Sequence, residues 1–324
     1  MKVPAIIRKS CPPRVFSGRL LLFLLCLTFP AAIGPRGVDA GAPRAAVFVS
    51  QDIRPYIEAV EGINAALAEE GKADVEVFSL AKIEGKSRDL LLERVTDAEF
   101  ALSIAIGPEA VKLVSQAESP GKPPWMYSMI LNPPSVCRKA ETACGVSLDL
   151  PARQQLEMIA RGLPAVKRLG LLFDPQCNGD FSGTAASEAG SFHLSLVPLP
   201  VSSKKDIPAV LKEHWQDIDA LWLIPDQTVI SESIVQYIIK EALLAGVPVV
   251  GYNRFFYESG AALAFVFDYK DLGRQTGRLA AGVLGGRPCE KESPVFRVWR
   301  NRRVINKLGL GVPETAAPPI EEGP

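Results

Sequence analysis

Histidine is the scarcest ionisable residue in this chain of 324 residues, with His193 and His214 as its two examples. A zinc site needs closely spaced cysteines or histidines, and neither histidine has such a neighbour in the sequence. Six cysteines in so long a chain are too few for a disulfide scaffold. The composition excludes a small zinc-stabilised or disulfide-rich protein and indicates a globular chain, for which the length suggests two domains.

The common catalytic motifs are also missing. No G-x-S-x-G turn, Walker phosphate loop or glycine-rich dinucleotide turn follows any expected strand. His193 lies in an alternating strand pattern and His214 at a predicted helix end, and neither has a nucleophile beside it. We therefore expect no enzyme and no cofactor. An exported enzyme stays open as an alternative, because a fold can assemble acidic residues that are far apart in sequence.

The first forty residues have the pattern of a secretory signal peptide. Five basic residues, from Lys2 to Arg19, precede an apolar run at 20–29, and small residues follow. The run is short for a bilayer span, which favours export over an uncleaved membrane anchor. Val38 and Ala40 have the modest side chains that a signal peptidase requires, so cleavage is expected after Ala40. We predict a periplasmic protein with a signal peptide at 1–40.

Export changes the charge and the state of the cysteines. Removing 1–40 takes away six Lys or Arg and one Asp, so the formal charge falls from 0 to −5. A chain with this negative charge has no positive electrostatic potential to attract nucleic acid. We therefore expect no nucleic-acid partner. Cys137 and Cys144 flank a short polar loop, and in an oxidising compartment we expect them to form a local disulfide.

Short apolar runs alternate with amphipathic segments along the remaining chain. The expected strands are 45–49, 75–80, 100–106, 125–131, 168–173, 194–198, 220–224, 247–250, 261–267 and 295–299. The expected helices are 55–70, 87–96, 108–117, 151–161, 182–190, 207–215, 231–245 and 272–284. Continuously apolar strands between helices predict an α/β fold with parallel sheets covered on both faces.

The plan of the chain occurs twice. The segment 100–128 has a strand, a helix and a second strand, and so has the segment 220–251. Two similar lobes follow from this repetition. The last residues, 314–324, are rich in Pro, Ala and Glu and are expected to be disordered.

Polar loops between a strand and the next helix, here called corners, follow many of the expected strands. Ligands of open parallel α/β sheets lie outside the carboxyl ends of the strands, where loops and helix N-termini meet. Any single Asp, Asn, Ser or Thr there is more often a helix cap than a ligand contact, but we expect part of the set to line a cleft. The candidates are Ser50, Gln51, Gly107, Pro108, Glu109, Tyr127, Asn132, Asp174, Asn178, Asp226, Thr228, Asn253, Arg254 and Asp268.

Several of these corners lie in segments that resemble a known family. DALWLIPDQTVIS at 219–231, GLPAVKRLGLLFDP at 162–175, DYKDLGRQ at 268–275 and NKLGLGVP at 306–313 carry the resemblance. These segments are similar to the substrate-binding component of ABC transporters of the tryptophan/tyrosine-binding type. The resemblance extends over about 44–313.

The resemblance implies a type I periplasmic-binding-protein fold, in which two Rossmann-like lobes are joined by three crossover segments and close around a small ligand. On this plan, 44–148 and 269–290 form the N-terminal lobe, and 149–268 and 291–313 form the C-terminal lobe. The crossovers are expected near 147–150, near Asp268 and near 286–294. A membrane permease is the implied partner, and a monomer is expected.

Three segments depart from the family pattern and leave the ligand open: Pro108 with Glu109, the region from Leu131 to Cys137, and the aromatic stretch 252–257. Arg254 could pair with a ligand carboxylate and Asp226 or Glu109 with an ammonium group, which suits an amino acid or a similar amphipathic molecule. Tyr127, Tyr252 or Phe255 could stack on a flat group. A surface arginine and core aromatics are an equally weighted alternative.

Two other functions remain possible from the sequence. The same bilobed protein could report its ligand to a membrane receptor or kinase, or it could be an exported enzyme that uses the cleft. A LacI-like repressor shares the fold, but the signal peptide and the missing helix-turn-helix region argue against it.

Overall fold

The computed structural model describes residues 43–82, 90–91, 93–94, 99–117, 121, 123–229, 231–312 and 319–324. They belong to one compact unit, Gly41–Pro324, which contains two β-sheets. The predicted signal peptide and most of the predicted helix 87–96 lie outside the described residues.

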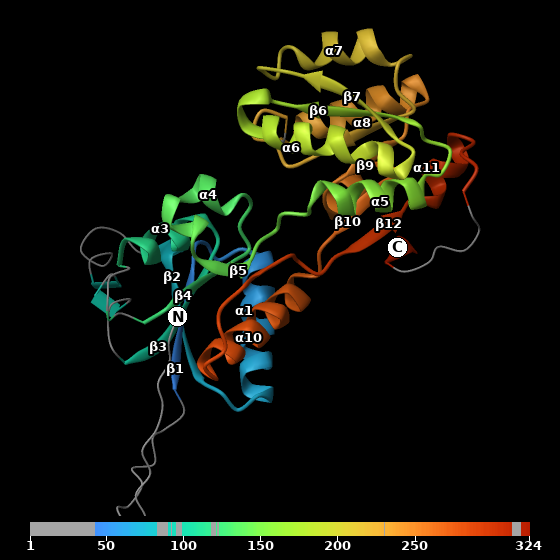
Figure 1. The fold of residues 1–324 in the computed structure, drawn as a ribbon. Coiled ribbons are helices and arrows are strands. Elements are labelled where there is room, and N and C mark those ends of the chain that lie inside the picture. The colour runs from blue at the N-terminus through green and yellow to red at the C-terminus, as the bar shows by residue number, and fades with distance from the viewer. Residues whose placement is uncertain are drawn as a thin grey trace, which may run out of the picture. The chain divides into compact units, whose positions relative to one another are not determined.

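The first sheet has six parallel strands in the order β11-β5-β4-β3-β1-β2. Its strands are β1 (Arg44–Val49), β2 (Asp74–Ser79), β3 (Phe100–Ile106), β4 (Trp125–Ser128), β5 (Cys144–Val146) and β11 (Lys291–Glu292). On one face α1 (Arg54–Glu69) and α10 (Tyr269–Leu284) lie side by side, and on the other lie α3 (Pro108–Ala117) and α4 (Pro133–Val136) (Figure 1). Short 3₁₀ helices occur at Leu80–Lys82 and Arg138–Glu141.

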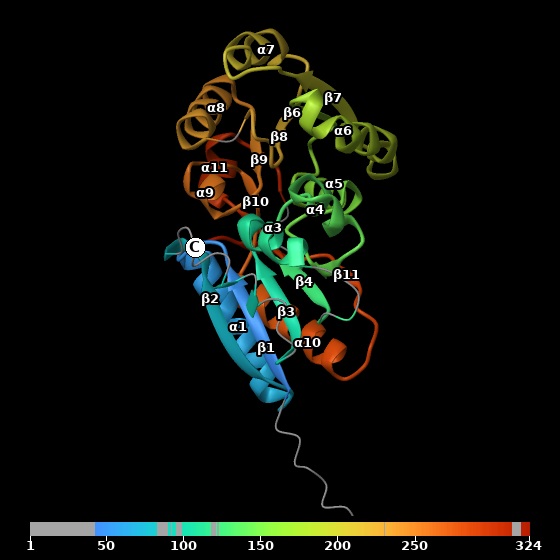
Figure 2. The same cartoon turned by 90° about the vertical axis from the view of Figure 1, so that its left-hand side faces the viewer.

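The second sheet has seven strands in the order β13-β12-β10-β9-β8-β6-β7. They are β6 (Arg168–Phe173), β7 (Ser195–Pro200), β8 (Ala220–Leu223), β9 (Val249–Gly251), β10 (Leu263–Val266), β12 (Arg297–Arg300) and β13 (Ile320–Glu322). Helices α5 (Ala152–Gly162) and α6 (Pro175–Ala189) lie on one side of it, and α8 (Glu232–Ala245) and α9 (Arg254–Glu258) on the other (Figure 2). The remaining helices are α7 (Ile207–His214), α11 (Arg302–Lys307) and the 3₁₀ turn Gly190–Phe192.

The two sheets repeat one strand order. The first contains β2-β1-β3-β4-β5 and the second β7-β6-β8-β9-β10, and within each series the strands are parallel. This confirms the predicted α/β class with two Rossmann-like halves. One strand departs from the parallel rule, because β12 runs antiparallel to β10.

Burial explains why the central strands form. Residues 45–49 of β1 are all buried, and so is the whole of β8, including the fully buried Trp222. Strands covered on both faces have no polar alternation, as their sequences predicted. Gly246 ends α8 with a left-handed backbone (φ 77°), and its N–H donates to the carbonyls of Ala242 and Leu243.

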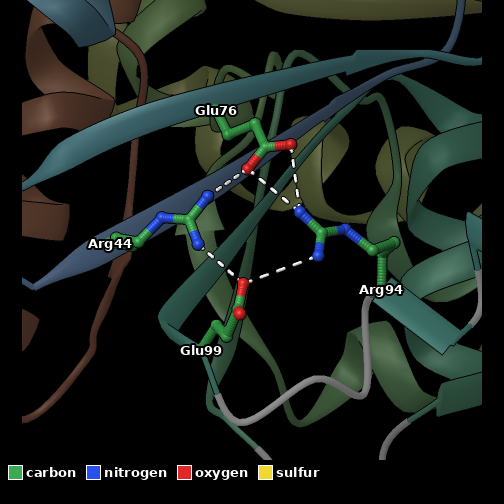
Figure 3. A network of polar contacts seen from close by, with 4 residues as sticks. All are labelled: Arg44, Glu76, Arg94 and Glu99. Atoms are coloured by element: carbon green, nitrogen blue, oxygen red, sulfur yellow. Dashed lines mark hydrogen bonds and ion pairs between the residues drawn. The ribbon is translucent and has the colours of Figure 1, made fainter.

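Four charged side chains form a ring of ion pairs at the amino ends of β1 and β3. Arg44 pairs with Glu76 and, at 2.6 Å, with Glu99, while Arg94 pairs with Glu76 at 3.1 Å and with Glu99 at 3.5 Å (Figure 3). The guanidinium of Arg44 also lies 5.0 Å from the centre of the Phe100 ring. The ring is partly exposed and lies at the strand ends opposite to those where a ligand is expected.

The chain passes between the sheets three times. It leaves β5 for α5 through 147–151, leaves β10 for α10 through 267–268, and leaves β11 for β12 through 293–296. The third passage begins later than expected, because Lys291 and Glu292 pair with Gly145 and Val146 in the first sheet. Their placement in the C-terminal lobe was therefore wrong.

The predicted tail also needs correction. Residues 320–322 form β13, which pairs in parallel with β12, so the end of the chain is not disordered throughout 314–324. Trp299 Nε1 donates to Glu321 at 2.8 Å, and the buried Arg300 binds Glu322. These pairs hold the last strand, although its composition alone resembles that of a disordered tail.

The predicted disulfide between Cys137 and Cys144 is wrong. Cys144 bonds to Cys289, with 5.7 Å between their Cα atoms, and Cys137 and Cys177 are free among the described residues. Cys144 begins β5, and Cys289 lies just before β11, the strand that pairs with β5. Sheet pairing thus brings together two residues that are 145 positions apart, while Cys137 follows α4 and packs against the first sheet's core.

Candidate functional site

A cavity of about 530 Å³ lies where loops from both sheets meet. The first sheet supplies Tyr127 of β4, 131–134 after β4, and 291–292 of β11, and the third passage supplies Ser293. The second sheet supplies part of α6, Ile224 and Pro225 after β8, and Tyr252 after β9. The first passage, 147–151, and Gln155 of α5 complete the wall. The cavity therefore lies at the carboxyl ends of the strands, where this topology places ligands.

Asp149 brings a carboxylate into the cavity from the first passage between the sheets. Its Oδ1 and Oδ2 accept the backbone N–H of Asn132 at 2.9 and 3.0 Å. Asn132 has a left-handed backbone (φ 44°), which turns this N–H toward the carboxylate. Burial raises the pKa of Asp149 above its usual value, and the hydrogen bonds from Asn132 and Ser147 oppose the shift. Asp149 was not among the site residues predicted from the sequence.

Asp226 is almost fully buried and holds the corner after β8 together. Its Oδ2 accepts the backbone N–H of Asp174 and the amide of Asn178, both at 2.8 Å. Its Oδ1 accepts the backbone N–H groups of Thr228, at 2.8 Å, and Val229, at 3.2 Å. Four donors occupy the carboxylate, so Asp226 connects two loops of the second sheet and is not available to a ligand ammonium group.

Asp174 has a similar structural role one strand away. It caps α6, where its Oδ1 accepts the N–H of Gln176 at 2.9 Å, and its Oδ2 accepts the hydroxyl of Thr228 at 2.7 Å. The hydroxyl bond and the cap bond lower the pKa of Asp174. Asp174, Thr228 and Asp226 thus form one network behind the cavity wall. Asn178 is their contact with the cavity, at a kink inside α6.

Gln155 is a buried polar contact between the cavity and the second sheet. Its Nε2 donates to the carbonyl of Leu150 at 2.8 Å, and its Oε1 accepts the indole N–H of Trp222 at 3.2 Å. The side chain therefore fixes the start of α5 against β8. Gln155 was not among the predicted site residues, because a glutamine in the first turns of a helix has no distinctive sequence pattern.

Three aromatic side chains border the cavity: Tyr127 of β4, Phe181 of α6 and Tyr252 after β9. Phe181 packs edge-on against Trp222, with 5.4 Å between ring centres, and Tyr252 packs against Phe267 at 5.8 Å. Burial raises the pKa of both tyrosine hydroxyls, and the charge of Asp149 adds to the shift. Both hydroxyls therefore stay protonated at neutral pH and can donate hydrogen bonds.

The other predicted site residues lie outside this cavity lining. In the first sheet Ser50 Oγ donates to the Ile106 carbonyl and accepts the Ala110 N–H, both at 2.9 Å, which is a structural role. Gly107 has φ 83° and closely approaches Ser50 and Tyr56, Pro108 and Glu109 begin α3, and Gln51 is exposed.

In the second half of the chain, Asn253 caps α9 and Asp268 caps α10. Arg254 is exposed and pairs with Glu258 at 2.7 Å, and its guanidinium lies 5.8 Å from the centre of the Trp299 ring. Of the fourteen candidates, Tyr127, Asn132 and Asn178 line the cavity. The arginine that was expected to bind a carboxylate is not among its lining residues.

Neither a metal site nor a membrane span is found in the described part of the chain. No three histidine, cysteine, aspartate or glutamate side chains there are grouped so as to hold a metal ion. None of the described helices combines the length and apolarity needed to cross a bilayer.

Residues 45–311 match the family model of ABC transporter substrate binding proteins. This chain belongs to that family. A comparison with curated proteins found no match. The matched residues include the sequence motifs at 162–175, 219–231 and 268–275.

Solved structures with the same fold include other substrate-binding proteins. A ligand-free, open substrate-binding protein with adhesive properties from Clostridium difficile has a TM-score of 0.70 and 16% identity, over 87% of this chain and 99% of that one. A Streptococcus pneumonia ABC domain in complex with L-Trp has a TM-score of 0.55 and 21% identity, over 84% and 96%. A periplasmic ribose ABC transporter protein from Conexibacter woesei has a TM-score of 0.58 and 13% identity, over 84% and 96%.

Proposed function

We propose that this substrate-binding protein acts in the periplasm, where it captures a small amphipathic solute, of the size of an amino acid, for an ABC permease. The observation that carries the proposal is the cavity, because its wall combines loops from both sheets with the passages that join them. Its volume, about 530 Å³, is in the range of small-molecule sites. The signal-peptide pattern at 1–40 supports export. A monomer is sufficient for this function, because one chain supplies the whole cavity wall.

The proposed mechanism is closure of the two lobes about the three passages. A ligand that touches Asn132 or Tyr127 from the first sheet and Asn178 or Phe181 from the second gains its full set of contacts only when both sides approach. This difference in contacts would favour the closed form, which the permease would recognise. This role requires binding and closure but no chemical step.

Thermal unfolding tests the proposal on protein that has been unfolded and refolded to remove any bound solute. We expect one class in a panel of amino acids, amines, carboxylates and sugars to raise the unfolding midpoint. A ligand at about one hundred times its Kd adds about 2.7 kcal/mol of stability. Tyr127→Ala should weaken the shift, and Arg254→Ala, outside the cavity, should preserve it. A panel without any active solute, or a shift that Tyr127→Ala leaves unchanged, contradicts the proposal.

A further inference from the structure

The cavity contains more acidic than basic side chains. Asp149, Asp180 and Glu292 are among its lining residues, and Lys291 is the one basic residue among those described. The Nζ of Lys291 donates to the backbone carbonyl of Glu141, which directs its charge away from a ligand. Glu292 accepts the Nε2 of Gln275 at 2.9 Å, a neutral donor. The charge of the lining is therefore negative.

Asp149 is the acidic residue of the lining that we expect to bind a cation most strongly. Its carboxylate is half-buried, accepts the Asn132 N–H and has no cationic partner among the described residues. Asp180, on the exposed side of α6, likewise has no cationic partner there. Asp149 thus lies in the first passage and Asp180 lies in α6, which covers the second sheet. Both residues line the same cavity. An ammonium group between them would be attracted from both sides.

The backbone N–H groups that could bind an anionic ligand at the starts of α6 and α4 already donate to acceptors within the protein. In the first turn of α6, the N–H of Gln176 binds the carboxylate of Asp174, and the N–H groups of Cys177 and Asn178 bind its carbonyl. At the start of α4 the N–H of Asn132 binds Asp149, and the next two positions are Pro133 and Pro134, which have no N–H. Helix starts often bind carboxylates, but these two offer the ligand few donors.

The aromatic lining supplies what a cation with an apolar body needs. Tyr127, Phe181 and Tyr252 all border the cavity, and a cation over an aromatic face gains electrostatic energy that a carboxylate does not. The hydroxyls of the two tyrosines and the amide of Asn132 can still hydrogen-bond a neutral part of the solute. Charge and aromatic surface therefore favour the same class of ligand.

We propose that the solute is an organic cation, an amine or quaternary ammonium compound with an apolar body, held by Asp149 and the aromatic lining. This inference rests on the proposed function of the same cavity. It differs from the amino-acid expectation because the guanidinium assigned to the ligand carboxylate, that of Arg254, is paired with Glu258 outside the lining.

Isothermal titration calorimetry of the refolded protein tests the inference with three probes that share a phenyl ring and differ in charge: phenethylamine, phenylalanine and phenylacetate. Choline is added as a cation without a ring. We expect phenethylamine or choline to bind at least about tenfold more tightly than phenylalanine or phenylacetate, because the latter two bring a carboxylate without a partner.

Variants locate the binding. Asp149→Asn should weaken the preferred cation about 10- to 100-fold, the usual loss for a hydrogen bond to a charged group. The control is Asp217→Asn, which removes the same charge from an exposed turn outside the lining and should leave the affinity unchanged. If Asp149→Asn does not fold, Asp180→Asn supplies the test and should weaken the cation several-fold. Equal affinity in both cavity variants and in the wild type overturns the inference.

The outcomes separate this inference from the proposed function. Tighter binding of phenylalanine or phenylacetate, or of a sugar in place of either cation, overturns the organic-cation inference and leaves the solute-binding function intact. No binding by any probe or panel solute overturns both. Cation binding that Asp149→Asn abolishes and Asp217→Asn preserves supports both.

Discussion

Asp226 illustrates how one side chain can resemble a ligand contact in the sequence and serve the fold in the structure. It follows a buried strand, as a ligand residue would, yet its two oxygens accept four hydrogen bonds from Asp174, Asn178, Thr228 and Val229. The corner that it forms positions Asn178 at the cavity wall. Its contribution to binding is therefore indirect.

We predict that Asp226→Ala lowers the free energy of unfolding by about 2–4 kcal/mol, because buried N–H groups lose their acceptor. Urea denaturation measures the loss. Asp217→Ala, at an exposed aspartate that pairs with His214, is the control and should change stability by no more than about 0.5 kcal/mol. A variant of Asp226 that loses ligand affinity at unchanged stability would contradict the structural role.

Asp149 should give the ligand-free protein a distinctive dependence on pH. Burial raises its folded-state pKa, so between the unfolded value, about 3.9, and the higher folded value the native state binds more protons than the unfolded state. The stability that this group contributes is thus present at low pH and is lost as pH rises through the folded pKa. The other titratable groups that line the same cavity are Tyr127, Cys177, Asp180, Tyr252, Lys291 and Glu292.

We predict that wild type loses stability relative to Asp149→Asn as pH rises through that range, and that affinity for a cation increases over the same range. Denaturation midpoints of the two proteins, measured from acid to neutral pH, give the difference. Asp174 contributes with the opposite sign, because its lowered pKa stabilises the protein above the ordinary carboxyl range, but it is common to both proteins and cancels. Parallel curves would contradict the assignment for Asp149.

At the scale of elements, the contact between α1 and α10 depends on glycine. A Cβ atom at Gly273 would overlap the backbone carbonyl of Ala59, and one at Gly62 would overlap that of Lys270. The backbones of the two helices therefore approach more closely than alanine would allow. This contact anchors α10, which enters the first lobe through the second passage, beside the hinge.

We predict that Gly273→Ala lowers the free energy of unfolding by about 1–3 kcal/mol through overpacking. Gly183→Ala provides a matched control, because this helical glycine of α6 has open space around it, and should raise stability by about 0.5–1 kcal/mol. Thermal or urea unfolding of both variants decides the matter. Equal effects of the two substitutions would show that backbone entropy, and not close packing, sets the response.

The regular elements were largely predictable because their physics is local. The expected strands 100–106 and 168–173 coincide with β3 and β6, since continuous apolar runs mark strands covered on both faces. The strands β11 and β13 were not predicted, because their order in the sheets depends on pairing with strands elsewhere in the chain. The helices α4 and α9 were not predicted because four and five residues are too few to show a helical apolar period. The repeated topology followed from element order, and the structure confirms it.

The site was less predictable than the fold. Asp, Asn and Ser at strand ends serve as caps and as ligand contacts with the same sequence pattern, so Asp174, Asn253 and Asp268 could not be separated from Asn178 beforehand. Asp149 and Gln155 were missed because only the passage between the sheets brings them into the cavity. Tertiary contacts, and not local pattern, select the lining.

At the scale of the whole molecule, the disulfide lies beside two of the three passages between the sheets. Cys144 and Cys289 join the strands β5 and β11 at one edge of the first sheet, and the passages at 147–151 and 293–296 begin just beyond these strands. Gln275 adds to this frame, because its Nε2 donates to the carbonyl of Ser293 at 2.8 Å and its Oε1 accepts the N–H of Val295. The disulfide and Gln275 thus fix the first-sheet ends of two of the three passages.

We predict that replacing both Cys144 and Cys289 by serine lowers the free energy of unfolding by about 2–5 kcal/mol, since the bond closes a loop of 145 residues. Reductant should destabilise the wild type in urea and leave the double variant unchanged. Cys177→Ser, at an exposed free cysteine, is the control and should behave as wild type. Sensitivity to reductant that disappears with Cys137→Ser would instead support the pairing expected from the sequence.

The central claim is that one solute is held by loops of both sheets in the cavity, and hydrogen exchange with mass spectrometry tests it most directly. The probe is the tightest-binding of phenethylamine, phenylalanine and phenylacetate, added at saturation. We predict slower exchange in peptides covering 131–134, 147–151 and 177–181 together, because these segments form the cavity wall. Slower exchange in the peptides of one sheet alone, or only at the groove beside Trp215 and Leu244, would contradict it.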